Sequence, residues 1–336
     1  MSATLTPGTT STAAPSPAPG PTRRLIAVLV LVPAVVALAL WAFAWPAART
    51  APRDLPIAVA GAPAAVAGIE QQLERKEGAF DVHRYDDEAA ARSAIEDRDV
   101  YGAIVATERG PKLLTASAAS PVVAQLLQQA ATAQAPEGAP LQVDDVVAAP
   151  PGDPRGAALG ASVLPMALAG VAAGAVVTLL GLRGVRAVLA LVGAAALVGI
   201  VAAALTHSWL GALTGDWWTE AGVLALTNLA VSAAVAGLAA VLGRAGLTLG
   251  ALAVVLIGNP FSGVGSAPEL LPEPAGALGQ WLPPGAGGTL VRSVSFFDGA
   301  QAAAPALTLS VWAGVGLLLV LLGALLGRGR SEPRAD

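Results

Sequence analysis

Long apolar segments without charged residues dominate the C-terminal half of the chain. Four of them contain no Asp, Glu, Lys, Arg or His: Gly156–Leu182, Ala187–Leu205, Ala221–Leu242 and Pro305–Leu326. A helix needs about 20 apolar residues to cross a bilayer core of roughly 30 Å, and a soluble helix of that length would carry a polar stripe. Each segment is therefore predicted to cross a membrane. Because no ionisable residue lies inside the spans, a proton or sodium relay through them is not expected.

Two further apolar segments complete the predicted bundle. Residues 23–45 are predicted as the first transmembrane helix, and their apolar length, beyond the about 7–15 residues of a signal peptide, favours a retained helix. Ala245–Gly258 is shorter and breaks at Asn259-Pro260. We interpret it as a span completed by irregular backbone, which at membrane depth must be covered by protein or line a cavity. The fold class is thus an α-helical integral membrane bundle of six transmembrane helices, five of them in residues 156–327.

Residues 46–155 have the mixed pattern of a small soluble domain inserted between the first two spans. Apolar runs predict strands at Leu55–Val59 and Val100–Val105, the latter with a hairpin partner at 112–116, and alternation predicts a strand at Phe80–Tyr85. A helix is predicted after the first strand, after the second and after the hairpin. The second helix is expected to start at Asp86 or Asp87 and the third at Ser120-Pro121. Their apolar faces are, in order, Val66, Ile69 and Leu73; Ala90, Ala94 and Ile95; and Val122, Val123, Leu126, Leu127 and Ala130. The order β-α-β-α-β-β-α predicts an α/β layer domain. The Pro-rich, acidic stretch 135–154 is interpreted as a linker.

Arginine positions predict which side of the membrane each loop occupies, because Lys and Arg near span ends stay cytoplasmic. One orientation places these arginines inside: Arg23, Arg24, Arg183, Arg186, Arg244, Arg328, Arg330 and Arg334. The same orientation puts all seven Trp residues at outer span ends, where the interface suits their rings. We therefore predict a multi-pass protein of the cell membrane with both termini cytoplasmic, a disordered tail at 1–22, a second tail at 328–336, and an extracytoplasmic α/β domain.

The outer segment 259–304 is too long to be a plain connection. It is predicted to contain two short helical pieces, one within Ala267–Leu282 and one at Thr289–Phe297. Two placements remain open from the sequence. The segment either re-enters the outer half of the bundle or lies flat on the membrane surface.

Seven residues of this segment are candidates for a substrate path or gate: Asn259, Pro260, Ser262, Gly263, Pro283, Pro284 and Arg292. Arg292 is the only basic residue in the outer loops of the spanning region. It is expected either to pair with Asp298 or Glu273, or to meet an anionic lipid or substrate. Ser262 has no partner base nearby in the sequence, which disfavours a nucleophile.

Composition excludes several kinds of chemistry. The 336 residues are 55% hydrophobic and 12% charged, with a formal net charge of −4, which is typical of a membrane protein and offers no basic surface for nucleic acid. The absence of Cys excludes disulfides and thiolate sites. His83 and His207 each stand alone, and the acidic run 86–88 is interpreted as a helix start rather than a calcium site. No catalytic residue, metal or cofactor is predicted.

Two small-residue motifs offer close helix contacts: Gly170-x-x-x-Gly174 and Gly323-x-x-x-Gly327. Glycines four apart let helices approach closely. They are expected either to pack within the bundle or to form the seam of a homodimer.

The order of these parts resembles a known family. The stretches Val100–Val105, Ala116–Ser120, Asn259–Gly263 and Leu282–Pro284, with Arg292, are similar to those of type-2 ABC exporter permeases, more closely the phage-infection-protein-like (YhgE/Pip-like) branch. The resemblance implies a membrane component of an export or cell-envelope system. Any ATP hydrolysis would come from a separate ATPase subunit, because this chain has no Walker-type loop.

Three functions remain as hypotheses. The first is a permease-like subunit that moves or gates an apolar or envelope-derived compound. The second is a non-transporting membrane protein whose outer domain binds a cell-envelope protein, and the third is a membrane enzyme. The chain differs from the family in two places: it has no amphipathic helix before the first span, and its predicted cytoplasmic loops, near Arg183–Arg186 and Gly243-Arg244, are short.

Overall fold

The computed structural model describes residues 21–108, 110–134 and 142–328. Residues up to Trp41 and residues from Ala42 onward form two separate compact units. The described part of the first belongs to helix α1 (Pro21–Ala48). This helix begins two residues before the predicted start, since proline suits a first helical turn that needs no N–H donor. The rest of the two predicted tails, apart from Arg328, lies outside the described residues.

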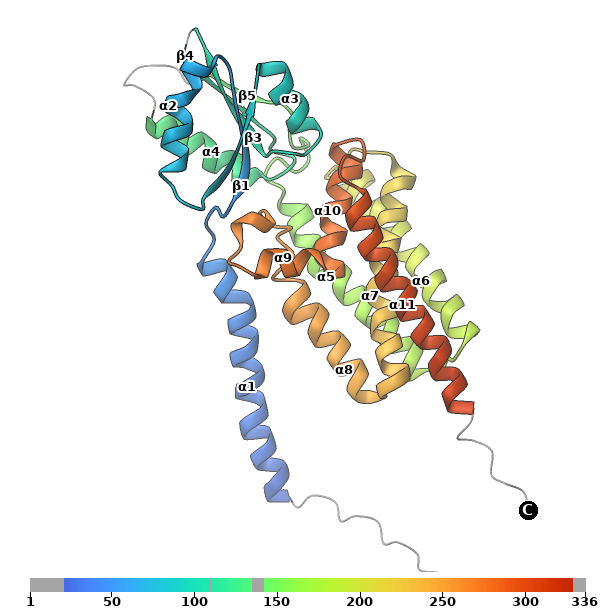
Figure 1. The fold of residues 1–336 in the computed structure, drawn as a ribbon. Helices are drawn as coiled ribbons and strands as arrows, with labels where there is room; N and C mark the ends of the chain where they lie inside the picture. The colour runs from blue at the N-terminus through green and yellow to red at the C-terminus, as the bar shows by residue number, and fades with distance from the viewer. Residues whose placement is uncertain (1–20, 109, 135–141, 329–336) are drawn as a thin grey trace, which may run out of the picture. The chain divides into compact units, whose positions relative to one another are not determined.

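Five described helices are long and apolar enough to cross a membrane, which is compatible with a multi-pass membrane protein. They are α1 (from Val28), α5 (Ala157–Leu179), α6 (Val185–Ala203) with its π-helical continuation η1 (Ala204–Trp209), α7 (Trp217–Leu242) and α11 (Ala303–Arg328) (Figure 1). Helix α8 (Arg244–Leu252) continues as π-helical η2 (Ala253–Gly258). It is apolar but too short to cross roughly 30 Å as a regular helix.

Helix α7 is the centre of the bundle, and it contacts α5, α6, α8, α11 and α10 (Pro283–Phe296) (Figure 1). The glycine motifs explain two of these contacts. A Cβ added to Gly174 would lie 2.7 Å from the Ser232 carbonyl oxygen of α7, and one added to Gly323 would lie 2.7 Å from Ala240 Cβ. The interpretation of the motifs as packing within the bundle is therefore confirmed at these positions. Gly174 and Gly323 face α7 of their own chain and are covered by it.

The α/β domain is a five-stranded sheet in the order β2-β1-β3-β4-β5. The strands are β1 (Leu55–Ala60), β2 (Phe80–Tyr85), β3 (Gly102–Thr107), β4 (Gly110–Thr115) and β5 (Gln142–Asp145); the helices are α2 (Pro63–Glu74), α3 (Glu88–Glu96) and α4 (Pro121–Gln134). Only the β3–β4 hairpin is antiparallel, with Gly102 opposite Thr115. The predicted order of elements is confirmed as far as α4. Two predicted caps are also found: Asp87 accepts from Ala90 N at 2.8 Å, and Ser120 Oγ from Val123 N at 3.2 Å.

Strand β5 corrects the interpretation of 135–154 as a linker; residues 135–141 lie outside the described residues. Four residues with two adjacent acids carry no strand pattern, but pairing with β4 supplies the backbone partners. Ion pairs neutralise the charge of Asp144 in this strand, because its carboxylate lies 2.5 Å from the Arg92 guanidinium and 3.2 Å from the Lys112 ammonium. The acidic run before α3 is connected to the same cluster, since Glu88 lies 2.7 Å from Lys112.

This cluster predicts acid sensitivity of the α/β domain. Hydrogen bonds from Lys112 lower the pKa of Glu88, and those from Arg92 lower the pKa of Asp144. A carboxyl whose folded pKa is depressed stabilises the fold above its unfolded pKa of about 4, and that stabilisation is lost as pH falls through the folded value. Because both carboxyls are partly exposed, the effect is modest. Thermal unfolding measured between pH 6 and pH 3 checks this prediction. The decrease in unfolding temperature on acidification should be smaller in Asp144→Asn than in the original chain, and unchanged in Asp86→Asn, which replaces an exposed acid.

The side chain of Asp153 caps the N-terminus of α5, the second predicted span, which the sequence pattern did not indicate. Its buried carboxylate accepts hydrogen bonds from the backbone amides of Ala157, Ala158 and Leu159 at 2.7, 2.9 and 3.2 Å. These are donors that a helix N-terminus otherwise leaves unpaired. We expect Asp153→Ala to lower the free energy of unfolding by about 1–2 kcal/mol. Asp153→Asn, which keeps an acceptor, should lose less in the same denaturation assay, and equal losses would contradict the capping role.

Candidate functional site

The predicted path residues nearest η2 form a tight loop, residues 259–266. Ser262 Oγ donates to the Asn259 carbonyl at 2.7 Å and accepts from Val264 N at 3.4 Å, so this hydroxyl serves the turn. Gly263 has φ +68°, and a Cβ there would lie 2.7 Å from Pro268 N. The loop therefore requires glycine at 263. Together with Phe43, Ala47 and Thr50, the residues Asn259, Pro260, Ser262 and Gly263 line a cavity of about 300 Å³.

Two long side chains hold this loop from the far side. Gln280 Nε2, at the end of helix α9 (Ala275–Gln280), donates to the Ser262 carbonyl at 2.9 Å. Arg292 Nη2, from helix α10 (Pro283–Phe296), donates to the Val264 carbonyl. Thr289 Oγ1 of α10 donates to Gln280 Oε1 at 2.7 Å, which joins the two helices. The loop is thus fixed by hydrogen bonds to α9 and α10.

Helix α10 begins six residues before the predicted start at Thr289. The sequence of Pro283–Gly288 is typical of a loop, because each glycine destabilises a helix by about 1 kcal/mol relative to alanine. Proline is tolerated in the first turn, however, and the glycines allow close approach to neighbours. A Cβ on Gly287 would lie 2.4 Å from Thr227 Cγ2 of α7, and one on Gly288 would lie 2.1 Å from Val264 Cγ2. Residues 283–288 are all buried, so this half of α10 lies inside the protein.

One face of α10 borders an apolar cavity of about 180 Å³ within the helical bundle. Pro284, Gly287, Gly288 and Val291 form the α10 wall. The other walls come from α5, the end of α6 with η1, and α7; they include Met166, Leu205, Leu224 and Val231. The side chains around this cavity are almost entirely apolar, which suits an apolar guest and gives a polar one few partners.

A different face of α10, which carries Thr289 and Arg292, borders a polar cavity of about 190 Å³ that residues of the α/β domain also line. Residues of this polar cavity come from both sides: Arg98 and Tyr101 from the sheet domain, and Glu269, Gln280, Thr289, Arg292 and Gln301 from the segment 259–304. Tyr101 Oη donates to Glu269 Oε2 at 2.8 Å, and Arg98 Nη1 donates to the Thr289 carbonyl at 3.2 Å. Burial raises the pKa of Tyr101 and lowers the pKa of Arg98, both in the α/β domain.

Arg292 does not make either of the predicted ion pairs. Among the described residues it has no carboxylate oxygen within 4.0 Å, and neither Asp298 nor Glu273 pairs with it. Both acids are exposed, whereas the Arg292 side chain points into the packed interior with a relative exposure of 6%. The structure thus divides six of the seven predicted residues over three cavities: four at the loop, Pro284 at the apolar one and Arg292 at the polar one. Pro283 begins α10 and lines none of the three.

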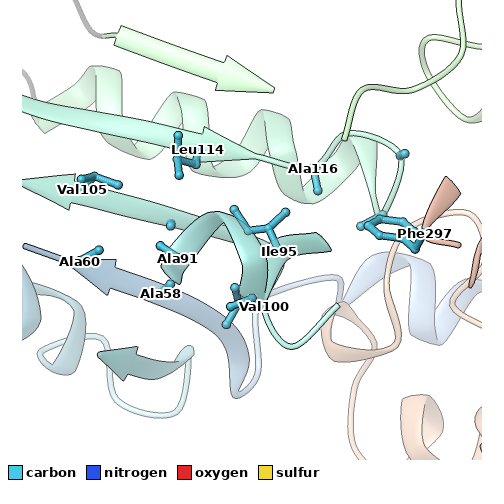
Figure 2. Packing of buried hydrophobic residues seen from close by; sticks show 13 residues of the cluster. Ala58, Ala60, Ala91, Ile95, Val100, Val105, Leu114, Ala116 and Phe297 are labelled. Carbon is cyan, nitrogen blue, oxygen red and sulfur yellow. The ribbon is translucent and has the colours of Figure 1, made fainter. Parts of the chain in front are cut away.

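The C-terminal end of α10 is anchored in the α/β domain. Phe297 is buried in the same core as Ala58, Ile95, Val100 and Leu114, and Figure 2 shows its ring on the side of Ala116. Arg98 lies over this ring, with its guanidinium carbon 5.3 Å from the centroid. The N-terminal end of α10 therefore lies in the helical bundle, and Phe297, which directly follows its C-terminal end, lies in the core of the sheet domain.

Two polar features of the bundle were not predicted. His207 was expected to stand alone, but His207 Nδ1 lies 2.7 Å from Glu220 Oε2, and Glu220 is fully buried. Because η1 and α7 extend beyond the uncharged segments, the observed helices include both residues, which corrects the expectation of spans without ionisable groups. Asn228, in the middle of α7, is fully buried, and no residue in the described part of the chain offers its side-chain amide a hydrogen-bond partner.

Comparison of the chain with protein-family models, curated proteins and solved structures found no match. Its function is therefore inferred from the geometry of the three cavities and of helix α10.

Proposed function

We propose that the chain is a six-span protein of the cell membrane, with α8 and η2 as the sixth and shortest span. The loop 259–266 and helix α10 complete that span as covered, irregular backbone. The arginines at the α5–α6 and α7–α8 connections support a cytoplasmic side there. Exposed Trp209, Trp218 and Trp281 support a membrane interface at the other end, near the α/β domain.

We further propose that it acts as a permease-like subunit of an export or cell-envelope system. The apolar cavity carries this proposal. It lies inside the helical bundle, is walled by four of its elements, and is bounded by α10, whose far end is anchored in the outer domain. Such a site suits an apolar compound taken from the membrane, because apolar walls can contact its surface and it needs no charged or polar partner.

Helix α10 suggests how the outer domain controls the cavity. A movement of the sheet domain displaces Phe297, and the rigid helix transmits that displacement to Gly287, Gly288 and Val291 at the cavity wall. The hydrogen bond from Arg292 to Val264 carries the movement to the loop 259–266. In this proposal the cavity opens or closes with the position of one helix.

ATP hydrolysis is assigned to a separate protein. The connections that would meet it are short, with α5 ending at Leu179 before α6 starts at Val185, and Gly243 alone between α7 and α8. These short connections favour the second candidate function, a non-transporting membrane protein whose outer domain binds cell-envelope partners. A possible homodimer would need a surface other than the glycine positions that face α7.

Purification of the full chain from native membranes in mild detergent separates the two functions. The permease proposal expects a Walker-motif ATPase in stoichiometric amount, with ATPase activity raised by an apolar membrane extract. Val291→Trp, which fills the cavity, should abolish that stimulation, whereas Val311→Trp, on an exposed position of α11, should keep it. Recovery of envelope proteins without an ATPase would reject the permease in favour of the second function.

A further inference from the structure

The polar cavity contains more positive than negative charge. Arg98 and Arg292 bring two guanidiniums, and Glu269 brings the one carboxylate among its described lining residues, which leaves a formal charge of +1. Both arginines line this one cavity, so their like charges repel each other there. A buried charge is costly unless a partner offsets it.

The arginines keep donors available inside this cavity. A guanidinium has five N–H donors, and the recorded hydrogen bonds use one nitrogen of each, Arg98 Nη1 and Arg292 Nη2, both toward backbone carbonyls. Among the described residues, neither guanidinium has a carboxylate oxygen within 4.0 Å. The Glu269 carboxylate is engaged by Tyr101 Oη instead. The unused donors and the excess charge both favour an anion.

We propose that the polar cavity binds a small oxyanion, a phosphate or carboxylate group, through the guanidiniums of Arg98 and Arg292. Planar guanidinium forks match the oxygens of both groups. Gln301, which also lines the cavity, is exposed. The group comes either from a lipid headgroup or from a free anion.

A bound oxyanion would tie the α/β domain to α10, since Arg98 follows α3 of the domain and Arg292 lies on α10. Binding should therefore stabilise the contact between the two parts and restrain the helix that borders the apolar cavity. This inference goes beyond the permease proposal and needs no ATPase. Failure to recover an ATPase leaves it standing, and failure to bind an anion leaves the apolar cavity unaffected.

The test measures binding to the purified full chain in two arms. In the first, the chain in neutral detergent is titrated with inorganic phosphate, and separately with acetate, at constant ionic strength set by chloride. In the second, the chain in phosphatidylcholine nanodiscs is compared with the chain in nanodiscs that also contain phosphatidic acid. Native mass spectrometry identifies the bound species, and thermal unfolding gives the affinity. Saturable binding in the first arm assigns a free anion, and binding in the second arm alone assigns a lipid headgroup.

Three variants make the result specific to the polar cavity. Arg98→Gln should weaken binding by about tenfold or more, as expected for the loss of a charge-assisted hydrogen bond. Glu269→Gln keeps an acceptor for Tyr101 but removes the competing negative charge, so binding should strengthen several-fold. Arg75→Gln, on an exposed arginine of the sheet domain, should change nothing. No saturable binding in either arm, or binding that neither Arg98→Gln nor Glu269→Gln alters, would overturn the proposal.

Discussion

Replacing Phe297 by alanine is expected to cost about 3–5 kcal/mol of unfolding free energy, as for other buried aromatic residues. The ring fills the end of the sheet-domain core and carries Arg98 on its face, although it lies far along the chain from every strand. Its removal leaves a cavity and also releases the C-terminal end of α10. We therefore expect protection from hydrogen exchange to fall both in the sheet domain and along 283–296.

Phe297→Leu is the matched control, because it keeps most of the apolar volume. It should lose markedly less stability and preserve exchange protection in α10. If Phe297→Ala leaves α10 as protected as in the original chain, the anchoring of α10 by the sheet domain is wrong, whatever happens to the sheet itself. Unchanged hydrogen exchange in α10 would also remove the structural basis for the proposed control of the apolar cavity by the sheet domain.

Adding one methyl group to Gly316 is expected to disrupt the contact between α11 and α7. A Cβ there would lie 2.4 Å from the Ala233 carbonyl carbon, a backbone atom that cannot rotate away. Overpacking of this kind costs about 1–3 kcal/mol, and occasionally more, which outweighs the gain of up to about 1 kcal/mol from replacing glycine in a helix. Thermal unfolding of Gly316→Ala in detergent should show the loss.

Gly314 provides the control two residues away on the same helix. Apart from the neighbouring residues and backbone of α11 itself, no atom of the described residues lies within 4 Å of a Cβ added there, so Gly314→Ala should be neutral or slightly stabilising. Similar behaviour of the two variants would contradict the close contact of α11 with α7. The pair compares one chemical change at two sites of one helix, so helix propensity cancels between them.

Apolar length and alternation were enough to predict the long helices and most of the sheet domain. These patterns involve only residues that are close together in the sequence. The same holds for the caps at Asp87 and Ser120, each of which binds the backbone amide three residues further on. The features that the sequence did not indicate depend on distant partners. Strand β5 needs β4 and the cations Arg92 and Lys112, and the helical start of α10 needs the close approach of Thr227 and Val264.

The candidate site was predicted only in part for the same reason. The segment 259–304 stood out because it is long and rich in Pro and Gly, but its sequence does not tell which side chains face which cavity. Arg292 was singled out as an isolated cation, yet its partner is a backbone carbonyl rather than an acid. Arg98 and Tyr101 belong to a domain distant in the sequence, so no local pattern could connect them with Arg292. The sequence shows His207 and Glu220 13 residues apart, but it does not predict that they pair, because the pairing depends on the turn between η1 and α7.

Cysteine accessibility tests the proposed membrane arrangement most directly, because the chain has no Cys and each variant carries a single thiol. Glu96→Cys places it on an exposed position of the sheet domain, and Leu180→Cys places it at the α5–α6 connection. On intact cells, a membrane-impermeant maleimide should label Glu96→Cys, whereas Leu180→Cys should react only after permeabilisation. Labelling of Leu180→Cys on intact cells, with Glu96→Cys protected until lysis, would contradict the account.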